Sequence, residues 1–309
     1  VLDIGCNDGT LLASYKTQGL RHIGIDPSDV ALKARERGFE VVNDFFSADA
    51  FRRVHPQEKA RVVTSISMFY DLENPRSFVQ DIASVLADDG IWILEQSYLP
   101  SMLAINSFDT ICHEHLEYYS LAVLERLFGE CGLEVVDVHL NDVNGGSFRL
   151  CVAHTGRVKP SREAATRVQE LRVSEFELAL DTDTPYAEFR SNIRRIKNDL
   201  QAFLKKAKAE GKLVHGYGAS TKSNTTLQYC GINGDILPAI ADRNPRKWGS
   251  FTIGSRVKII SEEESRAAKP DYYLVLPWHF MPEFKVREKD FLARGGQFVV
   301  PFPQVHFVS

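Results

Sequence analysis

The chain begins with the stretch Val1-Leu2-Asp3-Ile4-Gly5-Cys6-Asn7-Asp8-Gly9, an apolar strand that runs into a glycine turn. In doubly wound α/β sheets the turn between the first strand and the first helix binds a cofactor, because glycine lets the backbone approach the ligand closely. The dinucleotide fingerprint G-x-G-x-x-G is absent, since Asn7 stands at the middle glycine. The turn therefore predicts a site for a polar group smaller than a pyrophosphate.

The first half of the chain alternates short apolar strands with helical stretches. This pattern predicts a mostly parallel, doubly wound sheet. The strands expected after the first are 22–25, 41–43, 62–66, 91–95, 133–140 and 148–153. The last two lie on either side of Asn144-Gly145-Gly146, a turn signal, so we expect them to form an antiparallel hairpin.

The second half predicts a helical connector and another α/β unit. Apolar residues recur at helical spacing within 156–211. The expected strands of the following unit, 212–309, are 212–216, 236–241, 257–260, 272–276 and 297–300. We therefore expect two domains, 1–155 and 156–309, each containing a Rossmann-like sheet.

Composition limits the class of protein. The 309 residues are 44% hydrophobic and 25% charged with a net charge of −4, which predicts a globular chain without bulk attraction to nucleic acid. No apolar run approaches the roughly 20 residues that cross a bilayer. The five cysteines are scattered, so neither a disulfide framework nor a cysteine-rich zinc site is expected, and a cytoplasmic location is favoured. The sequence leaves the oligomeric state open, with a monomer slightly favoured. The start at Val1, inside a strand, predicts that further chain precedes it.

Acidic residues follow the second and third strands. Asp26 can accept hydrogen bonds from both hydroxyls of a ribose, and Asp44 with Phe45 offers a polar edge and an aromatic wall for adenine. Together with the first turn, this order resembles the class I S-adenosylmethionine (SAM) methyltransferases; the alternative is a sheet without a cofactor. The resemblance implies a SAM site formed by Asp3, Gly5, Cys6, Asn7, Gly9, Asp26, Pro27, Asp44, Phe45 and Met68.

A second glycine turn, Gly216-Tyr217-Gly218-Ala219-Ser220-Thr221-Lys222, opens a helix of the second unit. Thr221 stands where the dinucleotide fingerprint has its third glycine, and Lys222 lacks the glycine that precedes a P-loop lysine. The first turn of the helix offers Ser220, Thr221 and Lys222 to an anion such as a nucleotide diphosphate. Alternatively, the turn only packs the helix on its strand.

The densest run of titratable groups is Thr110-Ile111-Cys112-His113-Glu114-His115-Leu116-Glu117-Tyr118-Tyr119-Ser120, which follows the fifth strand. The two histidines could bind a metal, but a third ligand at convincing spacing is missing, and a purely structural cluster is also open. General acid/base chemistry is favoured, because imidazole titrates near neutral pH and a neighbouring carboxylate can orient it. A tyrosine such as Tyr118 more often forms a pocket wall.

Five blocks together, 3–9, 112–119, 144–147, 215–222 and 277–279, resemble the SAM-dependent C-methyltransferases of nucleotide-linked deoxysugars. That family has a small zinc-binding domain, which would precede Val1, then a SAM domain and a C-terminal Rossmann-like domain that helps to hold the nucleotide sugar. The resemblance implies substrate binding by Asn144, Gly146, Ser147, Gly218, Ala219, Ser220, Lys222, Asn224 and His279.

The resemblance also implies methyl transfer to carbon. A 4-keto group acidifies the proton on C3 of the sugar, and His115 is the candidate base, with Glu114, His113 and Tyr118 as further catalytic candidates. Some members of the family have Tyr at the position of Cys112 and His at that of Asp71. His115 would then act alone, Tyr70 or Tyr118 would substitute, or the sugar would differ.

Three other functions remain open from the sequence. An O- or N-methyltransferase would need a base only for a hydroxyl or an amine. An NAD(P)-dependent oxidoreductase with tandem Rossmann units is weakened by the missing fingerprint in both glycine turns. A non-catalytic module that binds nucleotide sugars is disfavoured by the catalytic run.

Overall fold

The computed structural model describes all 309 residues, which form two compact units. The first unit comprises Val1–Pro100 and Leu116–Ala179, and the second comprises Ser101–His115 and Leu180–Ser309. This grouping differs from the division expected after residue 155. The helix after that point stays with the first unit because its side chains enter that core.

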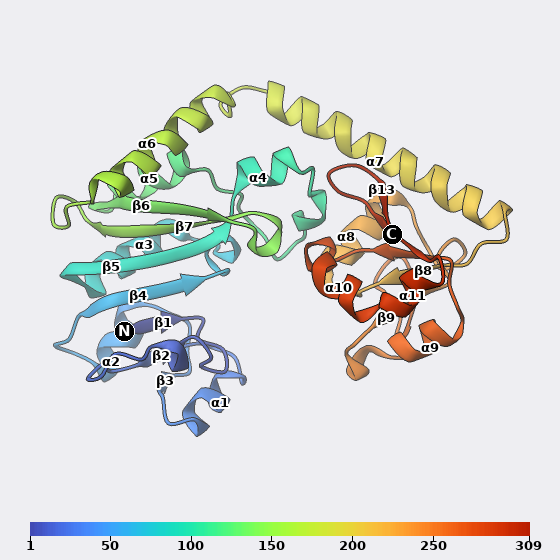
Figure 1. Ribbon diagram of the computed structural model, residues 1–309. Helices are drawn as coiled ribbons and strands as arrows, with labels where there is room; N and C mark the ends of the chain where they lie inside the picture. The colour runs from blue at the N-terminus through green and yellow to red at the C-terminus, as the bar shows by residue number, and fades with distance from the viewer. The chain divides into compact units, whose positions relative to one another are not determined.

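The first unit is built on a seven-stranded sheet of order β3-β2-β1-β4-β5-β7-β6 (Figure 1). Its strands are β1 (Leu2–Ile4), β2 (Ile23–Ile25), β3 (Glu40–Val42), β4 (Ala60–Ile66), β5 (Leu86–Ser97), β6 (Leu133–Asn141) and β7 (Ser147–His154). The strands β1 to β5 run parallel, whereas β7 pairs antiparallel with both β5 and β6. The predicted doubly wound sheet and its terminal hairpin are therefore confirmed.

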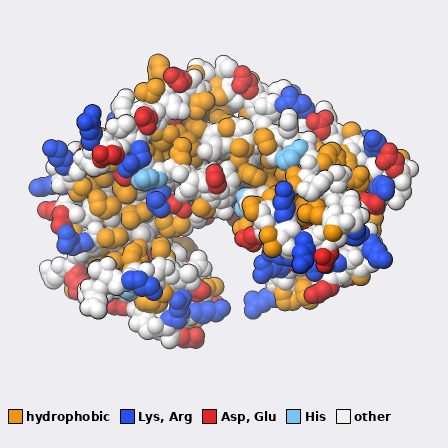
Figure 2. All heavy atoms as spheres, in the orientation of Figure 1, with side chains coloured by type: hydrophobic (Ala, Val, Ile, Leu, Met, Phe, Trp, Pro, Cys, Tyr) orange, Lys and Arg blue, Asp and Glu red, His pale blue; other side chains and the backbone are white.

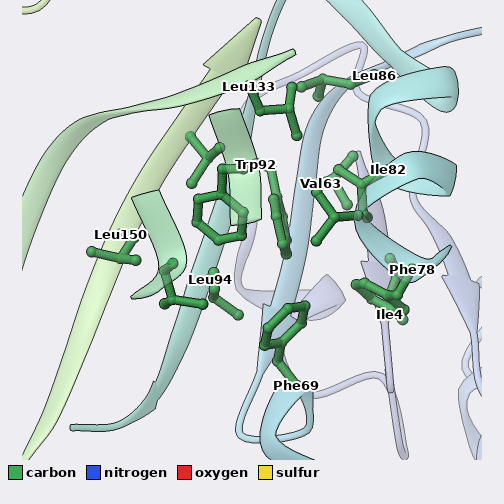
Figure 3. Close-up of a cluster of buried hydrophobic side chains, with 14 of the residues drawn as sticks. Ile4, Val63, Phe69, Phe78, Ile82, Leu86, Trp92, Leu94, Leu133 and Leu150 are labelled. Carbon is green, nitrogen blue, oxygen red and sulfur yellow. The ribbon is translucent and has the colours of Figure 1, made fainter. Parts of the chain in front are cut away.

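Helices cover one face of this sheet. They are α2 (Ala48–Val54), α3 (Pro75–Val85), α5 (Leu121–Gly129) and α6 (Arg162–Glu177). Apolar residues at helical spacing, such as Phe78 and Ile82 of α3, pack on Val63, Trp92 and Leu94 of the central strands (Figure 3). The indole N–H of Trp92 donates to the Ser65 hydroxyl at 2.9 Å, so this fully buried ring has no unsatisfied polar atom.

The opposite face of the sheet is covered only in part. There α1 (Ala31–Glu36) packs on β2 and β3 around Cys6, Leu12 and Val41. Along β4, β5 and β7 several outward side chains, among them Ile66, Ile93 and Cys151, are only half-buried. Figure 2 shows hydrophobic side chains gathered on this part of the unit. The uncovered part of the sheet begins beside the first glycine turn.

The second unit contains a six-stranded sheet of order β10-β9-β8-β11-β12-β13. The strands are β8 (Val214–Tyr217), β9 (Ala239–Asp242), β10 (Lys258–Ser261), β11 (Tyr272–Val275), β12 (Gln297–Val300) and β13 (His306–Val308). The helices are α7 (Thr184–Ala209), α8 (Thr221–Cys230), α9 (Glu262–Ala267), α10 (Met281–Arg287) and α11 (Lys289–Ala293). The chain leaves β8 towards β9 on one side and later places β11 on the other, so β8 marks a topological switch point.

Residues 101–115 belong to the second unit although they follow β5 in the sequence. They include most of α4 (Leu99–Ala104) and the short helix η3 (Phe108–Thr110). The ring of Phe108 lies 4.9 Å from that of Tyr229 in α8 and 5.2 Å from that of Phe302. These aromatic contacts anchor the segment that carries the histidines. None of the helices combines the length and the hydropathy of a bilayer-spanning segment.

Candidate active site

The first glycine turn is held by backbone geometry that few residues other than glycine adopt. Gly5 has φ +74° and Asn7 has φ +49°. The N–H of Gly5 donates to the carbonyl oxygen of Ile25, and the N–H of Asn7 donates to Asp26 Oδ2 at 2.9 Å. The turn after β1 is thus tied to the end of β2, which puts Asp26 beside the turn as the sequence predicted.

A cavity of about 620 Å³ opens beside this turn. It is lined by Asp3, Gly5, Cys6 and Asn7 together with residues of the uncovered sheet face. The Thr64 hydroxyl donates to Asp3 Oδ1 at 2.6 Å, yet burial dominates and raises the pKa of Asp3 to about 6. Burial likewise raises the pKa of the Cys6 thiol to about 12, which keeps it protonated and unreactive.

The other residues predicted for the cofactor lie at different places in the first unit. Met68 is next to the turn, since its Cγ would be 3.7 Å from a Cβ added at Gly5. A Cβ on Gly9 would meet Ala34 Cβ at 2.9 Å, so this glycine is explained by helix packing. Asp44 is exposed and pairs with Arg53 at 2.6 Å. Phe45 is 76% exposed, Pro27 is exposed too, and neither lines the cavity.

Several lining residues were not predicted from the sequence. They are Asp8, Thr10, Leu11, Tyr15, Thr64, Ile66, Ile93, Glu95, Arg149 and Cys151. Glu95 and Arg149 are paired across β5 and β7, and Asn141 of β6 donates to Glu95 Oε2 at 3.0 Å. For Glu95, the only signal in the sequence was a charged residue near the end of a buried strand. The order of the strands, which the sequence does not reveal, brings Glu95 and Arg149 to one cavity.

The second glycine turn is built for close approach of the backbone. Gly218 has φ +85°, and a Cβ there would lie 2.4 Å from Pro277 Cγ. Ser220 caps α8 in a reciprocal capping box with Ser223. In this turn Ala219 is buried, and its N–H donates to Asp242 Oδ2 at 2.8 Å. The helix therefore begins at a rigid turn whose polar groups are hydrogen-bonded.

Titratable groups gather around Lys222 in the second unit. Asp109 is fully buried and accepts a hydrogen bond from the indole N–H of Trp278 at 3.2 Å; burial raises its pKa to about 6. Burial lowers the pKa of Lys222, while the charge of Asp109 opposes that shift. Burial and the charge of Lys222 lower the pKa of His279 to about 4. The group therefore combines one acid, one amine and an imidazole that is neutral at physiological pH.

His115 shares this environment. Burial is the largest cause of its lowered pKa, and the charge of Lys222 lowers the pKa further. A hydrogen bond with the Thr110 backbone and the charge of Glu114 raise the pKa and partly offset the shift. A histidine with a lowered pKa is neutral at physiological pH and can accept a proton. His113 and Glu114 are exposed by comparison, with Glu114 Oε2 3.8 Å from the Cys112 thiol.

The predicted residues divide between the two units. The first unit holds Tyr118, Asn144, Gly146 and Ser147 besides all the residues predicted for the cofactor, whereas the second holds His113, Glu114, His115, Gly218, Ala219, Ser220, Lys222, Asn224 and His279. Ser147 is buried and its hydroxyl donates to the Val143 carbonyl at 2.9 Å. Asn144 has φ +55° in the preceding turn, η4 (Val143–Gly145). The side-chain oxygen of Asn224 is buried without a hydrogen-bond partner.

A Rossmann-like sheet with a cofactor-sized cavity beside its first glycine turn is the architecture of a class I methyltransferase. Residues 1–138 match the methyltransferase domain family, and residues 142–303 match the family described as the C-methyltransferase C-terminal domain. The chain is 34% identical to C-methyltransferase NovU of Streptomyces niveus, over 100% of this chain and 73% of NovU. It therefore belongs to the C-methyltransferase family and is a SAM-dependent methyltransferase.

More distant relatives match less than half of the chain. The ubiquinone biosynthesis O-methyltransferase of Thiobacillus denitrificans is 29% identical over 45% of this chain and 66% of its own length. Among solved structures, the O-methyltransferase NcsB1 from neocarzinostatin biosynthesis aligns with 50% of this chain and 48% of its own at 15% identity and a TM-score of 0.38, too loose a likeness to bear on the site. The family assignment displaces the oxidoreductase considered from the sequence.

Proposed function

We propose that this enzyme methylates C3 of a nucleotide-linked 4-keto-deoxyhexose, with His115 as the base that removes the C3 proton. The observation that carries the proposal is the environment of His115, whose pKa is lowered by burial and by Lys222. A carbon needs such a base, because it becomes nucleophilic only after losing a proton made acidic by the adjacent carbonyl. The similarity to C-methyltransferase NovU supports transfer to carbon.

The first unit would hold SAM in the cavity beside Gly5. Because Gly5 has no side chain, the ligand can approach the backbone. Asp26 is buried and does not line this cavity, but it is held against the turn by the N–H of Asn7, and its carboxylate would accept hydrogen bonds from ribose hydroxyls. Asp3 places a carboxyl group inside the cavity, where its ionised form favours a cationic ligand. When bound, SAM supplies an electrophilic methyl group on a sulfonium centre.

The second unit would hold the substrate and move the proton. A ring nitrogen of His115 takes the C3 proton, and the charge of Lys222 stabilises nearby negative charge on the substrate. Asp109, buried beside Lys222, opposes the loss of the lysine's proton. Since burial raises the pKa of the Cys112 thiol and keeps it protonated, His115 is the base in this proposal without help from the thiol.

The test is hydrogen exchange at C3 without methyl transfer. Wild-type enzyme in deuterated solvent, given its keto sugar but no SAM, should incorporate deuterium at C3. His115→Asn should lose this exchange, and its turnover with SAM should fall by about 10²- to 10⁴-fold. SAM binding, measured by calorimetry, should stay unchanged, because the variant alters the second unit only.

His306→Asn is the matched control, since this histidine also belongs to the second unit but lies in β13. Near-normal exchange and turnover in His115→Asn would refute the assignment of the base. A wild-type enzyme that transfers methyl without exchanging the C3 proton would instead indicate O-methylation. That second candidate is favoured by the similarity of 45% of the chain to an O-methyltransferase.

A further inference from the structure

Asp242 ends β9 directly beside the second glycine turn. Its side chain accepts the N–H of Ala219 on Oδ2 and the N–H of Asn244 on Oδ1, both at 2.8 Å. The Lys247 ammonium lies 3.3 Å from Oδ2. A carboxylate has about four acceptor positions, so about one remains for a ligand. The turn itself is tied to β9, because the N–H of Gly218 donates to the carbonyl oxygen before Asp242.

Asp26 has the same arrangement in the first unit. It accepts the N–H of Asn7 on Oδ2 at 2.9 Å, and the N–H and hydroxyl of Ser28 on Oδ1 at 2.8 and 2.6 Å. Each of the two aspartates thus follows the strand next to a glycine turn and receives three donors. An acidic residue at this place in a Rossmann-like half binds the hydroxyls of a nucleotide pentose. By position and hydrogen bonding, Asp242 is equivalent to Asp26.

A cavity of about 250 Å³ opens at Asp242. Gly218 and Asp242 line it on the side of the sheet, and Phe280, Phe284 and Arg243 line it as well. The volume is below the roughly 300–1,000 Å³ of pockets for whole drug-sized ligands, so it suits a single ring. Phe280 is 45% exposed and offers an apolar surface for a base, while Arg243 is exposed and carries a positive charge.

We propose that this cavity binds the pentose of the nucleoside diphosphate that carries the substrate sugar, with Asp242 accepting a hydrogen bond from a pentose hydroxyl. The inference rests on the proposed function and adds the orientation of the bound nucleotide sugar. The pentose lies at β9, and the diphosphate crosses the turn at Gly218 towards Lys222. The sugar then lies on the Lys222 side of α8, in the same unit as His115.

The test is nucleotide binding by the full chain, with dTDP and UDP as probes in calorimetry. Asp242→Asn should weaken both by roughly 10- to 100-fold, because a charge-assisted hydrogen bond is lost. With the nucleotide-linked keto sugar, the variant should raise KM while kcat changes little. Asp271→Asn is the matched control, since Asp271 also accepts a backbone N–H in this unit, from Leu213 at 2.9 Å, but precedes β11.

A change of ligand tests the same contact without altering the protein. Wild-type enzyme should bind dTDP about tenfold more tightly than 3′-deoxythymidine diphosphate, and Asp242→Asn should not distinguish the two. If wild type binds both equally, or if the variant keeps wild-type affinity for dTDP and UDP, the inference is wrong while the proposed function stands. If wild type binds no nucleotide at all, the proposed nucleotide-linked substrate fails as well.

Discussion

At the scale of single residues, the cavity beside Gly5 contains a carboxyl group, Asp3, whose ionisation is made unfavourable by burial. Asp3 is 3% exposed, and its pKa is raised to about 6 from 3.8 chiefly by burial. The folded state therefore binds more protons than the unfolded state between about pH 4 and 6, and the free energy of unfolding falls as the pH rises through that window. A carboxylate that costs stability at neutral pH and lines a cavity is typical of a functional group.

Asp3→Asn should remove this cost. The shift of about two pKa units corresponds to roughly 3 kcal/mol, so we expect the variant to be more stable than wild type at pH 8 by about 1 to 3 kcal/mol and equal to it near pH 4. Urea unfolding at both pH values measures this difference. Asp29→Asn, at an exposed position, is the control. Equal pH dependence in wild type and Asp3→Asn would show that Asp3 does not titrate in this window.

At the scale of elements, both glycine turns depend on backbone geometry, but they differ in what a side chain would meet. A Cβ at Gly218 would meet Pro277 Cγ at 2.4 Å, whereas a Cβ at Gly5 would have only Met68 in ordinary contact at 3.7 Å. The turn at Gly218 is therefore fixed by the loop after β11 as well as by its own φ. Substitution there should disturb the start of α8, which carries Lys222.

Gly218→Ala should lower the free energy of unfolding by about 2 kcal/mol or more, because the steric clash adds to the roughly 1–2 kcal/mol of left-handed backbone. Gly249→Ala separates the two effects, since Gly249 has φ +80° but nothing within 4 Å of an added Cβ. Thermal or urea unfolding of both variants gives the comparison. A Gly218→Ala variant no less stable than Gly249→Ala would mean that Pro277 moves aside without cost.

Element boundaries show where local pattern was insufficient. β5 spans Leu86–Ser97, longer than the predicted 91–95, because β4 and β7 pair with it on its two sides. β13 (His306–Val308) was not predicted at all. It is three residues long and exists through antiparallel pairing with β12. Strands of this kind are specified by their partners, so their residues carry no strong periodic signal.

At the scale of the whole molecule, the aromatic core of the first unit supplies much of its stability. Trp92 is fully buried and lies 5.2 Å from the ring of Phe128 and 5.8 Å from that of Phe69. Trp92→Ala should reduce the free energy of unfolding by about 3–5 kcal/mol, measured by urea titration followed by circular dichroism. Val286→Ala, at a position 77% exposed, should change it by about 0.5 kcal/mol at most. Similar small losses in both would contradict the assignment of Trp92 to the core.

The amino-acid sequence alone determined the parts of this protein that depend on neighbouring residues. The alternation of apolar strands, the two glycine turns and the acid after β2 are local patterns, because side-chain period and backbone conformation are properties of short segments. They were sufficient to predict the doubly wound sheet and the places of the glycine turns in it.

Tertiary structure decided which distant residues meet. Glu95, Arg149 and Cys151 reach the cavity beside Gly5 only because β4, β5 and β7 are adjacent in the sheet. Asp109 influences Lys222 only because residues 101–115 pack on α8. Strand order and long-range packing follow from burying a shared core, which no window of the sequence contains. In both units, residues that the local sequence pattern predicts therefore lie beside partners that only the folded structure reveals.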